Sequence, residues 1–176
     1  MISNWNKSFN LVVQSEGGFS DDIRDPGNRL PDGRSGCTMW GCTQTNWEAY
    51  VGHKVTHDDM RALTKEDVKP LYKAKYWDAV AGDQLPLGVD YAAFDFAINA
   101  GPKQCRILMQ RALGVADDGA FGPRTLGAIQ AANKTDLLHK FSAVKIEFYK
   151  ALDNFPTYGK GWLNRVENVE KVASTM

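Results

Sequence analysis

The chain has 176 residues, of which 43% are apolar and 24% are charged; these values are typical of a globular protein of one domain or of two small lobes sharing a core. Its 21 basic and 21 acidic side chains cancel, so bulk charge offers no attraction to nucleic acid or to an anionic membrane, and no nucleic-acid partner is expected. No apolar run reaches the length of a signal peptide or of a membrane helix, so we expect a soluble chain made in the cytoplasm.

The chain has three cysteines, Cys37, Cys42 and Cys105, and an odd number is a poor disulfide framework. A zinc site built from the first two thiols with His53 and His57 stays open as an alternative. Its spacing differs from the closer, repeated spacing of structural zinc sites. We therefore expect buried or free thiols, with no metal and no cofactor.

The first predicted element is a helix over about residues 4–15, because Trp5, Phe9 and Val12 fall on one apolar stripe. Gly17-Gly18 is expected to end this helix, since glycine readily takes the left-handed conformation beyond a helix end. Glu16 is thus predicted to lie at the last turn of a packed helix, beside an open glycine turn.

Residues 18–43 are dominated by glycine, proline, aspartate, asparagine and arginine. Asp25-Pro26-Gly27-Asn28 and Pro31-Asp32-Gly33-Arg34 are turn-forming tetrads. We expect a small irregular hairpin or loop lobe here.

Helical patterns dominate the remainder of the chain. Thr43 is expected to cap a helix through Tyr50, and Thr64, with Asp67 three residues on, to start another through Tyr76. Further helices are predicted at about 89–100, 103–113, 123–132, 135–152 and 159–173. About eight helices against perhaps two short strands indicate an α+β class that is mostly α-helical.

Two of these helices carry side-chain expectations. The helix at 89–100 should turn Tyr91, Phe94, Ala97 and Ile98 toward one side, and the last helix should present Trp162, Val166 and Val169.

The segment 134–150 carries a mild excess of positive charge. Its charged residues include Lys134, Lys140, Lys145 and Lys150 against Asp136 and Glu147, four minus two, or +2. We interpret it as a solvated helix face. Membrane contact by these C-terminal helices is a weaker alternative, because membrane-binding basic helices usually carry more charge.

Cleavage of a glycosidic bond needs a protonated carboxyl group beside the leaving oxygen, and a partly dry pocket raises the pKa of such a group. Glu16 suits this chemistry, because its helix buries an aromatic stripe and the following glycines leave room for a sugar chain. From these properties alone, however, a polar residue near a helix end is the simpler interpretation.

An ordered set of motifs changes that interpretation. Residues 15–19 read Ser-Glu-Gly-Gly-Phe, residues 25–27 Asp-Pro-Gly, and residues 38–43 Thr-Met-Trp-Gly-Cys-Thr. Residues 72–78 and 95–101 continue the series with Tyr-Lys-Ala-Lys-Tyr-Trp-Asp and Asp-Phe-Ala-Ile-Asn-Ala-Gly. In this order the motifs resemble the muramidase signature of glycoside hydrolase family 108.

The C-terminal part carries a second resemblance. Residues 113–115, Leu-Gly-Val, and residues 118–126 resemble that family's predicted peptidoglycan-binding segment. We therefore expect a muramidase region at 1–92 and a helical peptidoglycan-binding region at 93–173, packed as one globular unit.

The resemblance implies a lysozyme-like fold and hydrolysis of the β-1,4 bond between N-acetylmuramic acid and N-acetylglucosamine in peptidoglycan glycan strands. It implies Glu16 as the general acid. Asp25 follows after eight intervening residues, the spacing seen in phage lysozymes, and would orient water or stabilise the oxocarbenium-like charge. Thr38 matches the next motif position, with Thr43 as the fallback.

Further residues are predicted to bind substrate. They are Gly17, Gly18, Trp40, Asn99 and Gly101. Asp21 and Asp22 compete with Asp25 but are expected to be solvated turn residues, and Trp47 and Trp77 are expected to belong to the core. Residues 28–36 are an insertion relative to the family pattern, interpreted either as a substrate-specific flap or as a longer surface turn.

Two alternatives to the hydrolase stay open: a non-catalytic peptidoglycan-binding or scaffold protein on the same fold, and a lytic transglycosylase, which uses one Glu without a water-positioning Asp. An amidase or zinc peptidase is disfavoured by the lack of a His-Glu-x-x-His motif. The resemblance implies a monomeric phage or prophage endolysin, held in the host cytoplasm until a holin releases it to the wall, although a bacterial origin fits equally well.

Overall fold

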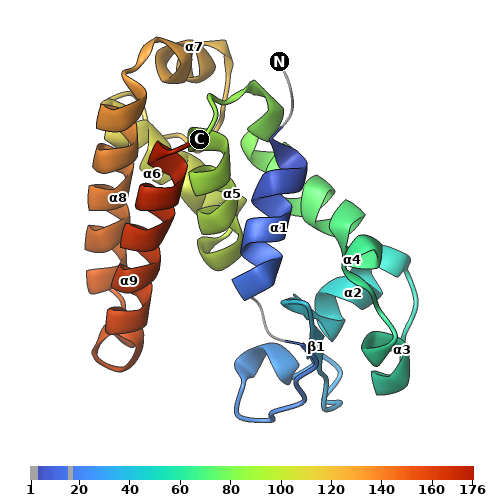
Figure 1. Cartoon of the computed structure of the whole chain (residues 1–176). Helices are drawn as coiled ribbons and strands as arrows, with labels where there is room; N and C mark the ends of the chain where they lie inside the picture. Colours follow the sequence, from blue (N-terminus) through green and yellow to red (C-terminus); the bar gives the residue numbers. More distant parts are fainter. Residues whose placement is uncertain (1–3, 16–17) are drawn as a thin grey trace. The chain divides into compact units, whose positions relative to one another are not determined.

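The computed structural model describes residues 4–15 and 18–176. Within them lie nine α-helices, several short helical turns and one two-stranded antiparallel sheet (Figure 1). The helices are α1 (Trp5–Ser15), α2 (Gln44–Val51), α3 (His57–Arg61), α4 (Lys65–Tyr72), α5 (Val89–Ala100), α6 (Pro102–Leu113), α7 (Pro123–Ala131), α8 (Lys134–Lys150) and α9 (Phe155–Ser174), and the strands are β1 (Thr38–Met39) and β2 (Cys42–Thr43). The mostly helical α+β class is confirmed.

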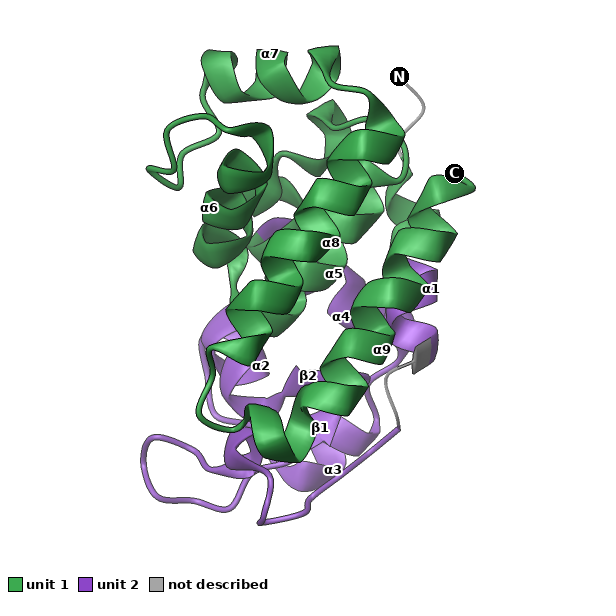
Figure 2. Ribbon diagram, turned by 90° about the vertical axis from the view of Figure 1, so that its left-hand side faces the viewer, with its two compact units in different colours: residues 1–8, 75–176 green, residues 9–74 purple. Residues whose placement is uncertain are grey.

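The chain forms two compact units, residues 9–74 and residues 1–8 with 75–176 (Figure 2). Helix α1 contributes to the core of each. The Trp5 ring packs against Trp77 and Phe94 within the larger unit, and the Phe9 ring meets Tyr72 edge-on within the smaller one. The predicted apolar stripe of this helix is therefore confirmed.

The smaller unit is built around the β1–β2 hairpin. Thr38 pairs with Thr43 and Met39 with Cys42, which leaves a two-residue turn at Trp40-Gly41. Both turn residues have positive φ, 52° and 73°, as required by the tight turn whose twist matches that of paired strands. The hairpin runs directly into α2, because the Thr43 side chain accepts the Asn46 N–H as the predicted cap.

A small apolar cluster supports this hairpin. Cys37, Val55 and Met60 form its buried centre, and partly buried side chains pack around it: Phe19, Met39, Trp47, Val51 and Leu63. Met60 belongs to α3, a helix that the apolar pattern did not predict. Its signal was present, since Thr56 and Asp59 form a reciprocal capping box.

The larger unit is centred on α5. Helices α8 and α9 run side by side in opposite directions in both views, and α6 packs on α5 and α8 (Figures 1 and 2). The expectation that α5 turns one side inward is wrong: every residue from Val89 to Ala97 is buried. A helix enclosed on all sides needs no polar face.

Two helices differ at their ends from the predictions. The Thr64–Asp67 capping box is confirmed, but the α-helix that it starts ends at Tyr72 and continues as a π-turn over Lys73–Trp77. Helix α9 begins at Phe155, before the predicted residue 159. Gly159 lies within this helix. The Phe155 ring occupies the space that a Cβ would need at this position, so the glycine permits close packing and does not mark the start of the helix.

The interpretation of the charged residues of 134–150 as a solvated helix face is wrong at one position. Lys145 is 2% exposed, whereas Lys140, Lys150, Asp136 and Glu147 are exposed. The sequence shows charge but not which side of a helix faces its neighbours. Among the described residues, no helix combines the length and apolar character that a membrane span requires.

Candidate active site

The predicted site residues fall in both units. Glu16 and Gly17 lie outside the described residues. Gly18, Asp25, Thr38 and Trp40 belong to residues 9–74, and Asn99 and Gly101 belong to the larger unit. Gly18 is exposed, and a Cβ at this position would meet no atom within 4 Å. The space beside Gly18 is therefore open, and its use by substrate stays a prediction.

The segment after Gly18 is joined to strand β1 by backbone hydrogen bonds and by the side chain of Asn28. Ser20 and Thr38 exchange backbone hydrogen bonds of 2.9 and 2.8 Å. The Thr38 hydroxyl donates to Asn28 Oδ1 at 2.8 Å, and Asn28 Nδ2 donates to the backbone oxygens of Ser20 and Asp22. Asn28 is fully buried, and a buried amide needs such partners. The structure thus gives Thr38 a positioning bond to a residue that sequence reasoning treated only as part of a turn.

Asp25 lies at the start of the same turn. Its carboxylate Oδ1 accepts the Gly27 N–H at 2.8 Å and so caps the 3-10 turn Pro26–Asn28. The residue is exposed, so its second oxygen has access to solvent. Because the Asn28 N–H also bonds to the Asp25 carbonyl at 3.0 Å, one turn links the predicted aspartate to the residue that holds Thr38.

Asp22, which competes with Asp25 as the second catalytic carboxylate, forms an ion pair. Arg24 Nη2 lies 2.7 Å from Asp22 Oδ2, and both side chains are exposed. The hydrogen bonds from Arg24 lower the pKa of Asp22 to about 2, so it is ionised at neutral pH and is no proton donor. The interpretation of Asp22 as a solvated turn residue is confirmed.

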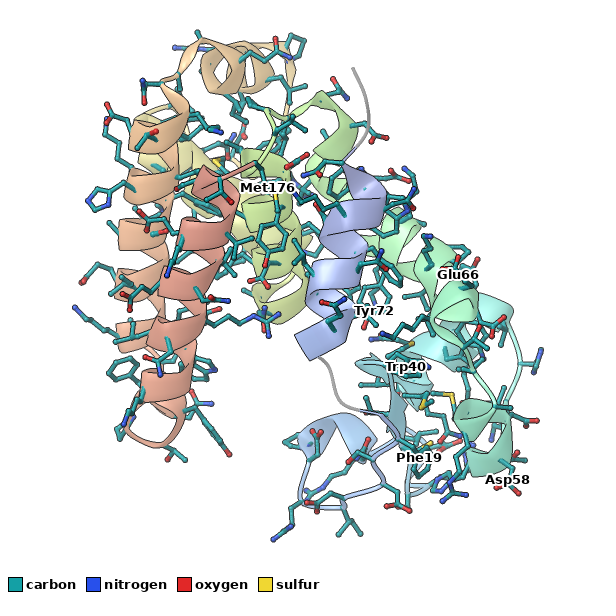
Figure 3. All side chains as sticks on the ribbon, viewed as in Figure 1. Phe19, Trp40, Asp58, Glu66, Tyr72 and Met176 are labelled. Carbon is teal, nitrogen blue, oxygen red and sulfur yellow. The ribbon has the colours of Figure 1, made fainter. Side chains whose placement is uncertain are left out.

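Trp40 forms hydrogen bonds through both its side chain and its backbone. Its indole N–H donates to the Leu63 carbonyl at 2.8 Å, and its own carbonyl accepts the Tyr72 hydroxyl at 3.0 Å (labelled in Figure 3). The Lys65 ammonium lies 5.0 Å from the ring centroid, within cation–π range. Trp40 is therefore a rigid, half-buried side chain, and its binding of sugar stays a prediction.

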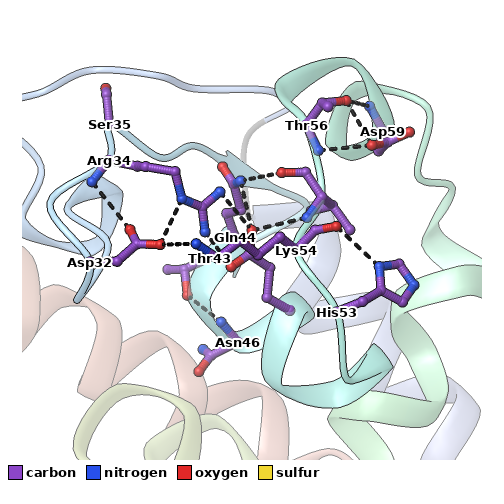
Figure 4. A network of polar contacts seen from close by, with 12 residues as sticks. Asp32, Arg34, Ser35, Thr43, Gln44, Asn46, His53, Lys54, Thr56 and Asp59 are labelled. Atoms are coloured by element: carbon purple, nitrogen blue, oxygen red, sulfur yellow. Dashed lines mark hydrogen bonds and ion pairs between the residues drawn. The ribbon is translucent and has the colours of Figure 1, made fainter.

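An ion-pair network anchors residues 28–36, the predicted insertion (Figure 4). Arg34 donates to both Glu48 oxygens, at 3.0 and 2.7 Å, and to Asp32 at 2.8 Å. Lys54 also bonds Asp32, at 3.0 Å. Glu48 additionally accepts the Gln44 amide and the Val55 N–H.

This network joins the predicted insertion to α2 and to Lys54 within the smaller unit. The hydrogen bonds from Arg34 lower the pKa of Glu48 to about 2, so the bidentate pair persists across the neutral range. Leu30, within the insertion, is buried. Sequence reasoning did not foresee Glu48 as the anchor, because it lies 14 residues from its partner.

In the larger unit, Asn99 and Gly101 lie at the end of α5. Gly101 caps α5 with φ 87°, so its conformation gives it a structural reason to be glycine. Asn99 is exposed, and its amide donates to the Asp95 carbonyl at 2.7 Å. Trp77 is completely buried, as expected for a core residue, and its N–H bonds Asp83. Trp47 packs against the apolar cluster of the smaller unit.

The cysteines and histidines considered for zinc have other contacts. The Cys37 thiol lies 3.4 Å from Gln44 Oε1, and ring nitrogens of His53 and His57 bond backbone oxygens. Among residues 4–15 and 18–176, no group of three His, Cys, Asp or Glu side chains is arranged to hold a metal ion. All three cysteines are buried, and no disulfide joins them.

Comparisons with known proteins agree with the fold and with the motifs. Residues 9–101 match the family described as glycosyl hydrolase 108, and residues 104–167 match a predicted peptidoglycan domain. The division at residue 92 stays a prediction. Among curated proteins, no match was found.

A solved structure, that of Brucella abortus SagA, is similar to the whole chain. It is 35% identical, with a TM-score of 0.85, and the alignment covers 98% of this chain and 94% of SagA. The lysozyme-like α+β fold is thereby confirmed. With a matching family model over more than half its length, the chain belongs to the glycosyl hydrolase 108 family, as a glycoside hydrolase directed at peptidoglycan.

Proposed function

We propose that this protein is an N-acetylmuramidase that hydrolyses the β-1,4 bond between N-acetylmuramic acid and N-acetylglucosamine, with Glu16 as the general acid. One observation carries the proposal: the family match over residues 9–101 includes the Glu16 motif and Asp25 after eight intervening residues. A carboxyl group at position 16 would donate its proton to the glycosidic oxygen as the bond breaks.

Asp25 and Thr38 are proposed to serve the water side of the reaction. The exposed Asp25 carboxylate has one oxygen held by the Gly27 N–H, and a fixed carboxylate suits the orientation of water or the stabilisation of developing positive charge. The Thr38 hydroxyl donates to Asn28, so its lone pairs are oriented and are available to accept a hydrogen bond from water.

The acid assignment is tested by Glu16→Gln, which keeps the shape of the side chain but removes the acidic proton. We expect at least a roughly 100-fold loss in the rate at which purified protein clears a suspension of peptidoglycan sacculi. Glu66→Gln is the matched control, because Glu66 is an exposed helix residue that pairs with Lys69 on the surface. Retention of most activity in Glu16→Gln would exclude Glu16 as the acid.

Mass spectrometry of the released fragments separates the remaining alternatives. A hydrolase leaves reducing N-acetylmuramic acid ends, whereas a lytic transglycosylase leaves a 1,6-anhydro sugar that is one water lighter. A binding or scaffold protein would sediment with sacculi without releasing any reducing sugar.

We also propose that the biological role is host-cell lysis, as a phage or prophage endolysin held in the cytoplasm until a holin opens the membrane. The family resemblance supports this setting. Glu16→Gln and its control Glu66→Gln test this role in Gram-negative cells. Expression of the active Glu66→Gln protein should cause lysis only after the inner membrane is permeabilised. Glu16→Gln should not lyse cells under either condition. Lysis without permeabilisation would contradict the dependence on a holin.

A further inference from the structure

Helix α9 carries two aromatic side chains on one face, and one of them is largely exposed. Tyr158 and Trp162 are four residues apart, their ring centroids are 5.8 Å apart, and their planes are inclined by 35°. Tyr158 is 56% exposed, the most exposed aromatic residue between positions 104 and 167. Trp162 is half-buried and stacks on the buried Tyr149 of α8 at 5.1 Å and 25°. The Tyr149 ring therefore supports one face of the Trp162 indole and restricts its motion.

A fixed polar group lies one turn further along the same helix. Arg165, three residues after Trp162, donates to both carboxylate oxygens of Asp95 of α5, with Nη2–Oδ1 at 2.8 Å and Nε–Oδ2 at 3.3 Å. The Asp95 side chain is 9% exposed and that of Arg165 is 30% exposed. Asn99, exposed one turn after Asp95 on α5, donates its amide to the backbone carbonyl of Asp95.

These residues suit an uncharged sugar better than a charged peptide. A pyranose ring has one face of C–H groups, which pack on an aromatic face, and an edge of hydroxyl and acetamido groups, which need planar, fixed hydrogen-bonding partners. Because Arg165 is paired with Asp95, its positive charge attracts the carboxylates of a wall peptide less strongly. Tyr and Trp also supply large contact area at low cost in conformational entropy.

We propose that Tyr158, Trp162 and Arg165, which we name the α9 stripe, form a binding subsite for an N-acetylhexosamine ring of the glycan strand. The inference rests on the proposed function, because it assigns a sugar subsite to a peptidoglycan hydrolase. It adds residues that the motifs did not identify. All three lie within residues 104–167, the segment matched to a peptidoglycan domain.

The test uses the full-length chain carrying Glu16→Gln, so that binding is measured without turnover. The probe is the peptide-free tetramer of N-acetylglucosamine, titrated by calorimetry. Tyr158→Ala should raise the dissociation constant roughly fivefold to tenfold, as expected for loss of one stacking contact. Trp162→Phe, which keeps an aromatic face against Tyr149, should have a smaller effect than Trp162→Leu.

The chain offers a matched control in the smaller unit. Tyr50 is 48% exposed, and its ring lies 5.6 Å from Trp47 at 35°, so it presents nearly the same ring geometry outside residues 104–167, the segment matched to a peptidoglycan domain. Tyr50→Ala should leave the dissociation constant within about twofold of the parent. An equal loss in Tyr50→Ala would show that exposed aromatics bind the sugar non-specifically, and the α9 stripe would then not be a subsite.

Other outcomes separate this inference from the proposed function. The inference fails if the parent does not bind the tetramer, or if Tyr158→Ala binds it as tightly as the parent. It also fails if Tyr158→Ala weakens binding only to a free wall peptide such as L-Ala-γ-D-Glu-meso-diaminopimelate. Absence of sacculus hydrolysis by the chain with Glu16 intact, together with Tyr158-dependent binding, would instead contradict the muramidase proposal and leave the subsite standing.

Discussion

Lys145 is a cation enclosed by the larger unit. Its ammonium lies 4.6 Å from the centroid of the Phe141 ring, and the side chain is almost completely buried. Loss of hydration lowers the pKa of Lys145, while the charge of Asp95 partly opposes this effect. Because Asp95 is already paired with Arg165, it compensates Lys145 incompletely, and burial of the ammonium costs stability.

Replacement by an apolar side chain of similar length should therefore stabilise the protein. We expect Lys145→Met to raise the free energy of unfolding by about 1 kcal/mol or more at pH 7. A lowered native pKa means that the unfolded lysine, with its ordinary value of 10.5, binds more protons. The free energy of unfolding of the wild type therefore rises with pH. Between pH 7 and 10 it should approach that of Lys145→Met.

Urea unfolding of both proteins at pH 7 and pH 9.5 measures this difference. Lys140→Met, a substitution of an exposed lysine on the same helix, is the control and should change stability by no more than about 0.5 kcal/mol. A Lys145→Met variant that is less stable than wild type at both pH values would show that the ammonium makes a net stabilising contact.

Helix α5 begins without a conventional side-chain cap at its N-cap residue, Gly88. Instead, Asp90 of its first turn closes the end: its Oδ1 accepts the Gly88 N–H at 2.8 Å, the Tyr91 N–H at 2.6 Å and the Asn4 amide at 3.2 Å. The Ala173 carbonyl of α9 approaches Gly88 so closely that a Cβ would overlap it. Glycine is needed there both for space and for its φ of 90°.

The three bonds to one oxygen distinguish two substitutions of Asp90. Asp90→Ala removes the acceptor and should cost about 1–3 kcal/mol, because buried donors lose their partner. Asp90→Asn keeps an oxygen at Oδ1 and should cost less than about 1 kcal/mol at pH 7. Thermal unfolding of the two variants, compared with wild type, tests this ordering, and equal losses would contradict it.

The pH dependence of Asp90 has a definite sign. Burial raises the pKa of this carboxyl above its ordinary value, against the smaller opposing effect of its hydrogen bonds. The native state thus holds the proton longer than the unfolded state, so this contribution to stability is present at low pH and is lost as pH rises through the native pKa. The free energy of unfolding of wild type minus that of Asp90→Asn should accordingly be smaller at pH 7 than at pH 4.

The three cysteines provide chemical probes of both units of the molecule. Cys37 and Cys42 lie in residues 9–74 and Cys105 in the larger unit, and all three are buried. Burial raises the pKa of Cys37 to about 11 and that of Cys105 to about 12. Little reactive thiolate is therefore present at neutral pH, and reagents reach the sulfur atoms only when the structure opens.

We expect alkylation by iodoacetamide at pH 8 to be at least about 100-fold slower in the native protein than in denaturant for each of the three cysteines. Peptide mass spectrometry after pulses at increasing urea gives the opening of each unit separately. Fast labelling of Cys105 without denaturant would contradict its enclosure between α5 and its neighbours, where the thiol lies 3.2 Å from the Ala93 carbonyl.

Features that depend on neighbours in the sequence were predictable. The Thr43 and Thr64 caps act over three residues, the αL cap at Gly114 ends α6, and the motif series identified the family before any coordinates. Helix α3 was equally accessible through its Thr56 capping box. Such signals are local, because a hydrogen bond within one turn needs no knowledge of the rest of the chain.

Features that depend on distant partners were not predictable. Asn28 as the support of Thr38, the burial of Lys145 and the pairing of Arg165 with Asp95 across 70 residues all follow from which elements pack together. The sequence shows that a side chain is charged or aromatic, but its exposure and its partner depend on the neighbours that enclose it. For that reason Tyr158 and Trp162 became candidates for sugar binding only when α9 was seen against α5 and α8.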